Sequence, residues 1–261
     1  SQDPNRPLTG EMIGSGPFRL KADERVPGAR IVYTKFEGYV PRPDGTPSWT
    51  AGPKRVHFDR VEWRVMPDPS TAAAALQNNE VDWWETPLPD LLPVLRRHRD
   101  IVVERISEFG NLGVLRFNFL HPPFDNPAMR RALLPAIDQQ AFMQAAIGTD
   151  PALYHVPAGV FTPGTPLAND AGLEVLTRPR DLEAARRMLR EAGYKGERVV
   201  MLSATDLPVL QNLAEVAADL MRRIGFNVDL QAMDWGTHIQ RRTNRGPVDQ
   251  GGWSVFCTTW E

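Results

Sequence analysis

The stretch VVMLSATDLPVLQNLAEVAADLMRRIGFNVDLQA, residues 199–232, decides the fold of this chain. Its apolar ends, residues 199–203 and 226–232, predict two buried strands. Between them, apolar side chains recur at helical spacing from Pro208 onward, which predicts a helix that Gly225 ends. The inward-facing residues of that helix are Leu210, Leu213, Ala217, Leu220 and Ile224. The strand–helix–strand order predicts an α/β layer with largely parallel strands.

The regular pattern continues on both sides of this stretch. Asp181 predicts the N-cap of a preceding helix, and Asp234 predicts the N-cap of a following helix that runs to about residue 243. A last strand is expected over residues 252–257. Ligands gather beyond the carboxyl ends of parallel strands, often at helix N-termini. We therefore expect binding residues in three places, at residues 203–206, 233–235 and 258–260.

The first half of the chain is richer in strands and turns. Four strands are expected there, over residues 29–36, 61–66, 101–106 and 112–118. Ser70 is expected to cap a short alanine-rich helix. Pro127 predicts the first turn of another helix, which Pro135 interrupts, and Asp138 caps a further helix that runs to Gly148.

The composition argues against several classes of protein. There are 30 basic and 32 acidic residues, so the net charge of −2 gives no reason to expect nucleic acid or an anionic membrane as a partner. Cys257 is the only cysteine, and we expect it to be a buried apolar side chain. The five histidines have no metal-ligand spacing, and no nucleophile elbow or phosphate-binding loop occurs. We therefore expect no catalytic residue, no metal and no cofactor, and a protein that is not an enzyme.

The seven tryptophans give a sharper indication. Trp63 is expected in the core, as is one member of the consecutive pair at residues 83–84. Trp235 and Trp260 lie at expected strand ends, near Trp253. Aromatic side chains line small-molecule clefts, where they stack on a ligand whose polar ends are held by hydrogen bonds. We place these three tryptophans in such a cleft.

Six segments of the chain resemble the peptide/nickel/opine-type solute-binding proteins, family 5 of the extracellular solute-binding proteins of ABC transporters. The segments are GSGPFRL from Gly14, FEGY from Phe36, DPSTAAAALQNNEVDWWE from Asp68, LRFNFLHPPFDNPAMRRALLPAIDQQAFMQAAIG from Leu115, DLEAARRMLREAGY from Asp181 and DLMRRIGFNVDLQAMDW from Asp219. They occur in the order of the family and extend over essentially the whole chain.

The resemblance implies an α/β fold of the periplasmic-binding-protein-like kind, type II, cluster C. Members have two lobes that close over a ligand, and they are considerably longer than this chain. The chain is then expected to be a fragment: residues 1–108 would be part of lobe I, and residues 109–261 would be most of lobe II, ending at the return hinge. A signal peptide, which the sequence as given lacks, would lie outside it.

The resemblance also implies a function. The chain would be the substrate-binding component of an ABC importer, capturing a peptide-like or other small solute between the lobes by hinge closure. Its expected partners are that small-molecule or short-peptide ligand and the ABC permease of the inner membrane, with no nucleic acid. Its expected location is the periplasm.

The expected ligand contacts come from the two segments that would cross between the lobes, together with the tryptophan cleft. They are Phe109, Gly110, Asn111, Leu112, Trp235, Trp253, Phe256, Thr258 and Trp260. In peptide-binding members, an acidic residue three positions after the tryptophan equivalent to Trp253 pairs with the peptide's ammonium group. Phe256 stands at that position, and a buried ammonium there would lose its counter-charge. The departure favours an aromatic or amphipathic solute, or a peptide held by the rest of lobe I.

Two alternatives stay open at the level of sequence. The same domain can serve as the ligand-sensing part of a transcriptional regulator, which a DNA-binding module elsewhere in the protein would indicate. A hydrolase using Asp234 or Glu261 is the other alternative, which carboxylates with perturbed pKa values in a closed pocket would indicate.

Overall fold

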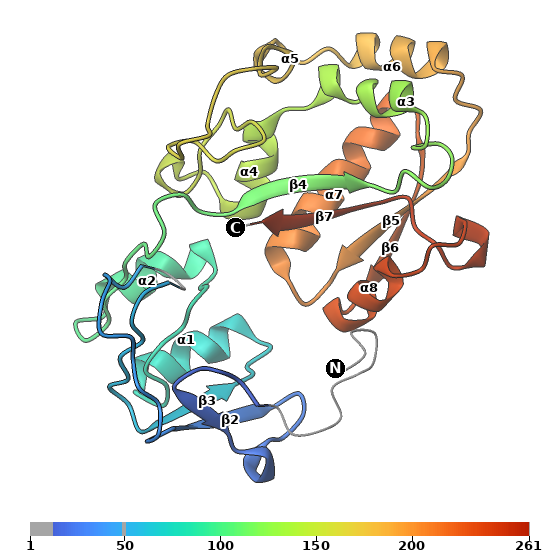
Figure 1. Cartoon of the computed structure of the whole chain (residues 1–261). Helices are drawn as coiled ribbons and strands as arrows, with labels where there is room; N and C mark the ends of the chain where they lie inside the picture. Colours follow the sequence, from blue (N-terminus) through green and yellow to red (C-terminus); the bar gives the residue numbers. More distant parts are fainter. Residues whose placement is uncertain (1–12, 49–50, 261) are drawn as a thin grey trace. The chain divides into compact units, whose positions relative to one another are not determined.

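The computed structural model describes residues 13–48 and 51–260 (Figure 1). The chain folds as two compact units, Ser1–Asp82 and Trp83–Glu261. Within the described residues, no helix combines the length and the apolar character that a bilayer crossing requires. The boundary expected between residues 108 and 109 would divide the two lobes of a longer protein, and it remains a prediction.

The first unit is built on a three-stranded antiparallel sheet in the order β1-β2-β3. Its strands are β1 (Phe18–Leu20), β2 (Arg30–Lys35) and β3 (Arg60–Arg64). Strands β2 and β3 confirm the two strands predicted in this region, and Val32 in the central strand is fully buried. The expectation that Trp63 is a core residue is wrong. Trp63 pairs with Ile31 on the sheet face opposite Val32, and it is 59% exposed.

Helix α1 (Pro69–Gln77) follows β3, and its N-cap is Asp68. An Asp68 carboxylate oxygen accepts hydrogen bonds from the Thr71 backbone N–H and from the Thr71 hydroxyl, both at 2.7 Å. The Thr71 hydroxyl and N–H thereby hold the pKa of the Asp68 carboxyl below its usual range. The expectation that Ser70 caps this helix is wrong, because Pro69 occupies the first helical position and the cap must precede it.

Replacing Asp68 with Ala is expected to lower the free energy of unfolding of the first unit by about 1 kcal/mol, because the Thr71 N–H would lose its acceptor. Ser70→Ala is the matched control, since Ser70 is exposed and lies inside the helix. Urea unfolding of both variants measures the difference. An equal loss in the two variants would contradict the assignment of the cap.

The second unit contains a four-stranded sheet in the order β4-β7-β5-β6. Its strands are β4 (Leu112–Phe117), β5 (Arg198–Ala204), β6 (Asn227–Met233) and β7 (Val255–Trp260). Strand β5 runs parallel to β6 and β7, as the strand–helix–strand pattern predicts, while β4 pairs antiparallel with β7. The predicted helix between β5 and β6 is α7 (Pro208–Ile224), and it ends at Gly225 in the left-handed conformation, φ 113°.

Most helices of this unit lie on one side of the sheet (Figure 1). The helices are α2 (Leu92–Arg97), α3 (Pro127–Arg131), α4 (Gln139–Ile147), α5 (Glu174–Thr177), α6 (Leu182–Glu191), α7 and α8 (Trp235–Arg242). Residues of α3, α4, α6 and α7 pack with Val199, Met201, Val255 and Cys257 of the sheet in one large apolar core. Cys257 is buried, as expected, and burial raises the pKa of its thiol to about 12.

Short 3-10 turns complete both units. They are Ala22–Glu24, Pro89–Leu91, Leu134–Ala136, Pro151–Leu153 and Val248–Gln250. Asp138 caps α4 as expected, accepting the Ala141 N–H at 3.1 Å. Of the consecutive tryptophans, Trp83 is 69% exposed and Trp84 is partly buried, so neither is a fully buried core residue.

Two strand predictions differ from the structure. Residues 101–106 form no strand, and the last strand begins at Val255 rather than at residue 252. The later start has a physical cause in the preceding turn: Gly251 has φ 82°, and a Cβ on Gly252 would lie 1.9 Å from the Gly246 carbonyl oxygen. The Gly252 N–H donates to the Pro247 carbonyl within this turn at 2.9 Å, and not to a neighbouring strand. The strand also ends later than predicted, so Thr258 and Trp260 lie within β7 and not beyond its end.

Candidate functional site

The candidate site lies on the side of the second sheet that faces away from the large core. Strand alternation in β7 directs Phe256, Thr258 and Trp260 to this side, while Val255 and Cys257 enter the core. Val200 and Leu202 of β5 pack against Phe256 in a separate apolar cluster. The neighbouring strand adds Arg116, whose partner in the β4–β7 register is Phe256. We call this surface, with the residues of α8 that pack on it, the Phe256 face.

Helix α8 supplies three side chains at helical spacing: His238 and Arg242 contact Phe256, while Trp235 also packs against the large apolar core. Asp234 fixes the start of the helix by accepting the Thr237 N–H at 3.0 Å, and Asp206 accepts the Trp235 N–H at 2.8 Å. Trp235 and His238 then stack on each other, with ring centroids 5.0 Å apart. One turn further on, Arg242 follows on the same side of the helix.

Aromatic rings form the centre of the Phe256 face. Phe256 is 1% exposed, and its ring meets Trp253 edge-on at 4.9 Å and His238 edge-on at 5.5 Å. Trp253 is fixed at both ends: its indole N–H donates to the Arg242 carbonyl at 3.1 Å, and its own carbonyl accepts from the Asn118 amide at 2.9 Å. The rings are thus held in place before any solute arrives.

Two arginines carry the charge of this face. The Arg242 guanidinium lies 4.2 Å from the centroid of the Phe256 ring, and the Arg116 guanidinium lies 5.2 Å from that of Trp260. Burial, and secondly the charge of Arg116, lower the pKa of Arg242 from its usual value. The positive charge of Arg116 therefore acts on Arg242 on the same face of the sheet.

His238 lies near Arg242 as a neutral imidazole. It is 1% exposed, and its Nδ1 atom is buried with no hydrogen-bond partner among the described residues. Burial, followed by the charge of Arg242, lowers its pKa to about 4, and the charge of Asp206 opposes that change. Because protonation would place a second charge beside Arg242, the imidazole stays neutral near pH 7.

The structure brings together six of the nine predicted contact residues. Trp235, Trp253 and Phe256 belong to one aromatic group with His238, whereas Thr258, Trp260 and Leu112 lie further along the β4–β7 pair, where Leu112 pairs with Trp260. Thr258 is 7% exposed and Trp260 is 51% exposed.

The other three predicted residues precede β4. Phe109 is 47% exposed, and its ring lies 3.6 Å from the position that a Cβ on Gly164 would take. Gly110 adopts φ 63°, and its N–H donates to the Ser107 hydroxyl. Asn111 is exposed. Phe109 thus lies near a loop that the aromatic group does not contact, and the role of all three residues in binding remains a prediction.

Sequence reasoning missed Arg116, His238 and Arg242. The spacing of three and four residues that joins Trp235 to His238 and His238 to Arg242 was a usable indication, because it places all three on one side of a helix. Arg116 had no comparable indication, since its place depends on the pairing of β4 with the distant β7.

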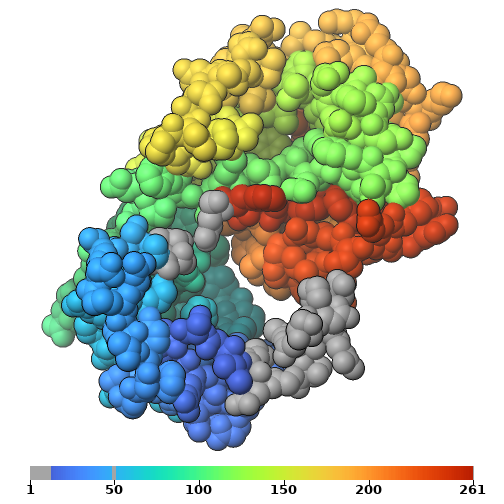
Figure 2. Space-filling model, viewed as in Figure 1, coloured from blue at the N-terminus to red at the C-terminus, as the bar shows by residue number. Residues whose placement is uncertain are grey.

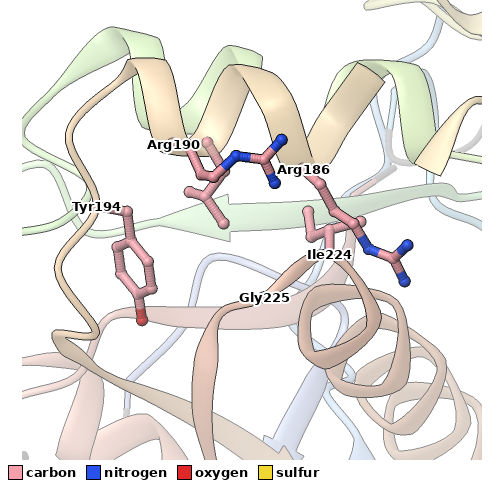
Figure 3. A pocket seen from close by; sticks show the side chains of 6 residues that line it. Arg186, Arg190, Tyr194, Ile224 and Gly225 are labelled. Carbon is pink, nitrogen blue, oxygen red and sulfur yellow. The ribbon is translucent and has the colours of Figure 1, made fainter. Parts of the chain in front are cut away.

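A separate hollow lies between α6 and the end of α7 (Figure 3). Its volume is about 240 Å³, and its lining residues are Arg186, Leu189, Arg190, Tyr194, Ile224 and Gly225. None of the nine predicted contacts belongs to it. Arg186 already donates to Glu183 and to the Arg223 carbonyl. We therefore interpret the hollow as a packing gap between two helices and not as a ligand site.

Asp234, one of the two carboxylates that the hydrolase alternative would use, is engaged as a structural group. Asp234 accepts both the N–H and the hydroxyl of Thr237, and these hydrogen bonds hold the pKa of its carboxyl below its usual range. An acid catalyst needs the opposite shift. Glu261, the other residue of that alternative, lies outside the described residues.

The fold places the chain in the class of α/β periplasmic binding proteins of type II. Solved structures of this kind resemble it over nearly its whole length. The dipeptide-binding protein of Pseudoalteromonas sp. SM9913 with Met-Leu matches 94% of this chain and 44% of its own, with 25% identity and a TM-score of 0.63. The Helicobacter pylori periplasmic binding protein with the peptide STSA matches 95% and 43%, with 21% identity and a TM-score of 0.72.

The chain belongs to the bacterial extracellular solute-binding proteins, family 5, whose model matches residues 1–260, and the resemblance stated from the sequence is thereby confirmed. It is 40% identical over 248 residues to a probable peptide ABC transporter periplasmic-binding protein of Sinorhizobium fredii. The aligned region covers 94% of this chain and 46% of the relative. The chain thus spans about half the length of this curated relative.

Proposed function

We propose that this protein captures a small solute for an ABC importer and that the Phe256 face forms part of its binding site. The observation that carries the proposal is an aromatic, arginine-bearing sheet face, fixed before binding, in a chain of a solute-binding family. The name of the Sinorhizobium fredii relative and the Met-Leu complex of the Pseudoalteromonas protein support a peptide-like solute.

Capture would proceed without covalent chemistry. Residues 1–108 and 109–261 would contribute to two lobes, and a solute that touches both would favour the closed form by its higher affinity for that form. The closed protein would then engage the permease in the membrane. A periplasmic location fits this role, because the Sinorhizobium fredii relative is named as a periplasmic-binding protein. The named relatives are transport proteins, which favours an importer over a transcriptional regulator.

A thermal-shift screen of the full-length protein against peptides, opines, metal chelates and sugars tests this proposal. One chemical class should raise the melting temperature in a concentration-dependent way, because a ligand that binds only the folded state stabilises it. Calorimetry would then give the affinity. A full-length protein that none of these classes stabilises would contradict solute capture.

Replacing Trp260 with Ala is expected to weaken solute binding about tenfold, which is about 1.4 kcal/mol, because an exposed ring beside Arg116 would be lost. The free energy of unfolding should change little, since the side chain is 51% exposed. Trp83→Ala is the control, because Trp83 is 69% exposed and lies outside the Phe256 face. Similar affinities of the two variants would count against the proposed site.

A further inference from the structure

Two arginines of the Phe256 face indicate which end of a solute this face would recognise, given the proposed function. Arg116 comes from β4 and Arg242 from the last turn of α8, two elements that the β4-β7 pairing and the packing of α8 against β5 bring onto the same sheet (Figure 1). Both guanidinium groups lie over aromatic rings of β7. The chain therefore gathers two positive charges at one place.

Neither of these arginines has a counter-charge among the described residues. Within residues 13–48 and 51–260, no carboxylate forms an ion pair with Arg116 or Arg242, and no acceptor receives a hydrogen bond from either guanidinium. Nearby arginines behave differently. Arg241 donates to the carbonyls of Gly251 and Gly252, and Arg198 pairs with Asp229 at 3.0 Å.

The acidic groups around this face are engaged elsewhere. Asp206 accepts the Trp235 N–H and Asp234 caps α8, while Asp229 is held by Arg198 and by Gln231. His238, which packs directly against the aromatic group, is a neutral imidazole. In the described part of the chain, none of these carboxylates forms an ion pair with Arg116 or Arg242.

Covering such a face with a solute has a definite electrostatic requirement. A desolvated guanidinium is costly unless it is paired and hydrogen-bonded, and here a like charge lies close to it. A contact between a cation and an aromatic ring offsets only part of that cost. A solute that presents an ammonium group would add a third positive charge. A solute that presents a carboxylate would neutralise the pair, and its two oxygens match the guanidinium fork.

We infer that the solute carries a carboxylate, which Arg116 and Arg242 hold, and that an apolar part of the solute packs on the rings of Trp253 and Trp260. The positions of the rings and the guanidinium groups support both halves of this assignment. The charge pattern makes the anionic end of the solute, and not a cationic end, the one that this face recognises.

The test uses the full-length protein and a panel of apolar tripeptides in three forms: unmodified, N-acetylated with a free carboxylate, and C-amidated with a free ammonium. Calorimetry measures each affinity. We expect amidation to weaken binding at least tenfold, and acetylation to weaken it much less. Equal affinities for acid and amide, or tighter binding of the amide, would overturn the inference.

Arginine variants connect that preference to the two residues. Arg242→Gln and Arg116→Gln should each lose at least tenfold in affinity for the acid form, and the preference for acid over amide should disappear. Arg242→Lys keeps the charge without the fork and should retain part of the preference, which separates a charge effect from a folding defect. Arg187→Gln is the control, because Arg187 is an exposed residue of α6 on the other side of the sheet.

The outcomes separate the two proposals. Binding of the peptides with no dependence on the carboxylate, or variants that keep the full preference, would contradict the carboxylate assignment and leave solute capture standing. Tighter binding of a phosphorylated analogue than of the acid would also contradict it. Failure of every form of the panel to bind would contradict the proposed capture of a peptide-like solute itself.

Discussion

Replacing Phe256 with Ala is expected to lower the free energy of unfolding of the second unit by about 3 to 5 kcal/mol. The ring is 1% exposed and contacts Trp253, His238 and the Arg242 guanidinium. Truncation would leave a cavity in the small apolar cluster with Val200 and Leu202, which two neighbouring strand residues cannot fill.

The measurement is chemical denaturation of the wild type and the variant, followed by tryptophan fluorescence. Phe119→Ala is the matched control: it removes the same ring from the same unit, but the ring is 60% exposed, and we expect a loss below about 1 kcal/mol. A loss of that small size in Phe256→Ala would show that the Phe256 face is not packed as described.

The second large effect is a pH dependence that comes from His238. The folded protein holds the imidazole pKa at about 4, and the unfolded chain returns it to 6.5. As the pH falls through 6.5, His238 takes up a proton in the unfolded state, whereas in the folded state it stays neutral down to about pH 4. The folded state should therefore lose about 3 kcal/mol from this one group across that window, with full stability above it.

His238→Phe isolates this contribution, because a flat aromatic ring is kept at this position and the titratable group is removed. The charged groups that act on His238 are Arg242 and Asp206, and both remain in the variant. The free energy of unfolding measured from pH 7 to pH 4 should fall less steeply in His238→Phe than in the wild type. His57→Gln, which removes an exposed histidine, should follow the wild type. Parallel curves for the wild type and His238→Phe would contradict the buried, neutral imidazole.

The part of the fold that sequence predicted well is the part with local causes. The helix at residues 208–224 needs only its own apolar spacing and Gly225, and its flanking strands are apolar throughout. The caps at Asp138, Asp181 and Asp234 are likewise set within a few residues. These features follow from short-range chemistry that the chain itself displays.

The parts that sequence could not predict depend on distant contacts. The start of β7 is set by the close approach of Gly252 to the Gly246 carbonyl, which no alternation of side chains reveals. Trp63 is exposed because its side of the first sheet is left uncovered. The apolar pattern at residues 101–106 has no neighbouring strand to pair with in the described part of the chain.

The candidate site divides in the same way. Trp235 and Trp253 could be predicted as site residues from sequence alone, because tryptophans near strand ends are typical of small-molecule clefts. The arginines were missed because only the structure distinguishes them from their neighbours. Arg241 and Arg198 have oxygen partners, whereas Arg116 and Arg242 contact only aromatic rings among the described residues. The C-terminal segment that carries α8 and β7 also reaches the molecular surface, as its red atoms in Figure 2 show.

A crystal structure of the full-length protein with its bound solute tests the central claim most directly. The account predicts solute atoms in contact with the Phe256 face, with a carboxylate within hydrogen-bond distance of the Arg116 and Arg242 guanidinium groups and an apolar part against Trp253 or Trp260. A solute bound elsewhere on the second unit, such as in the hollow between α6 and α7, with the two arginines still unpaired, would contradict it.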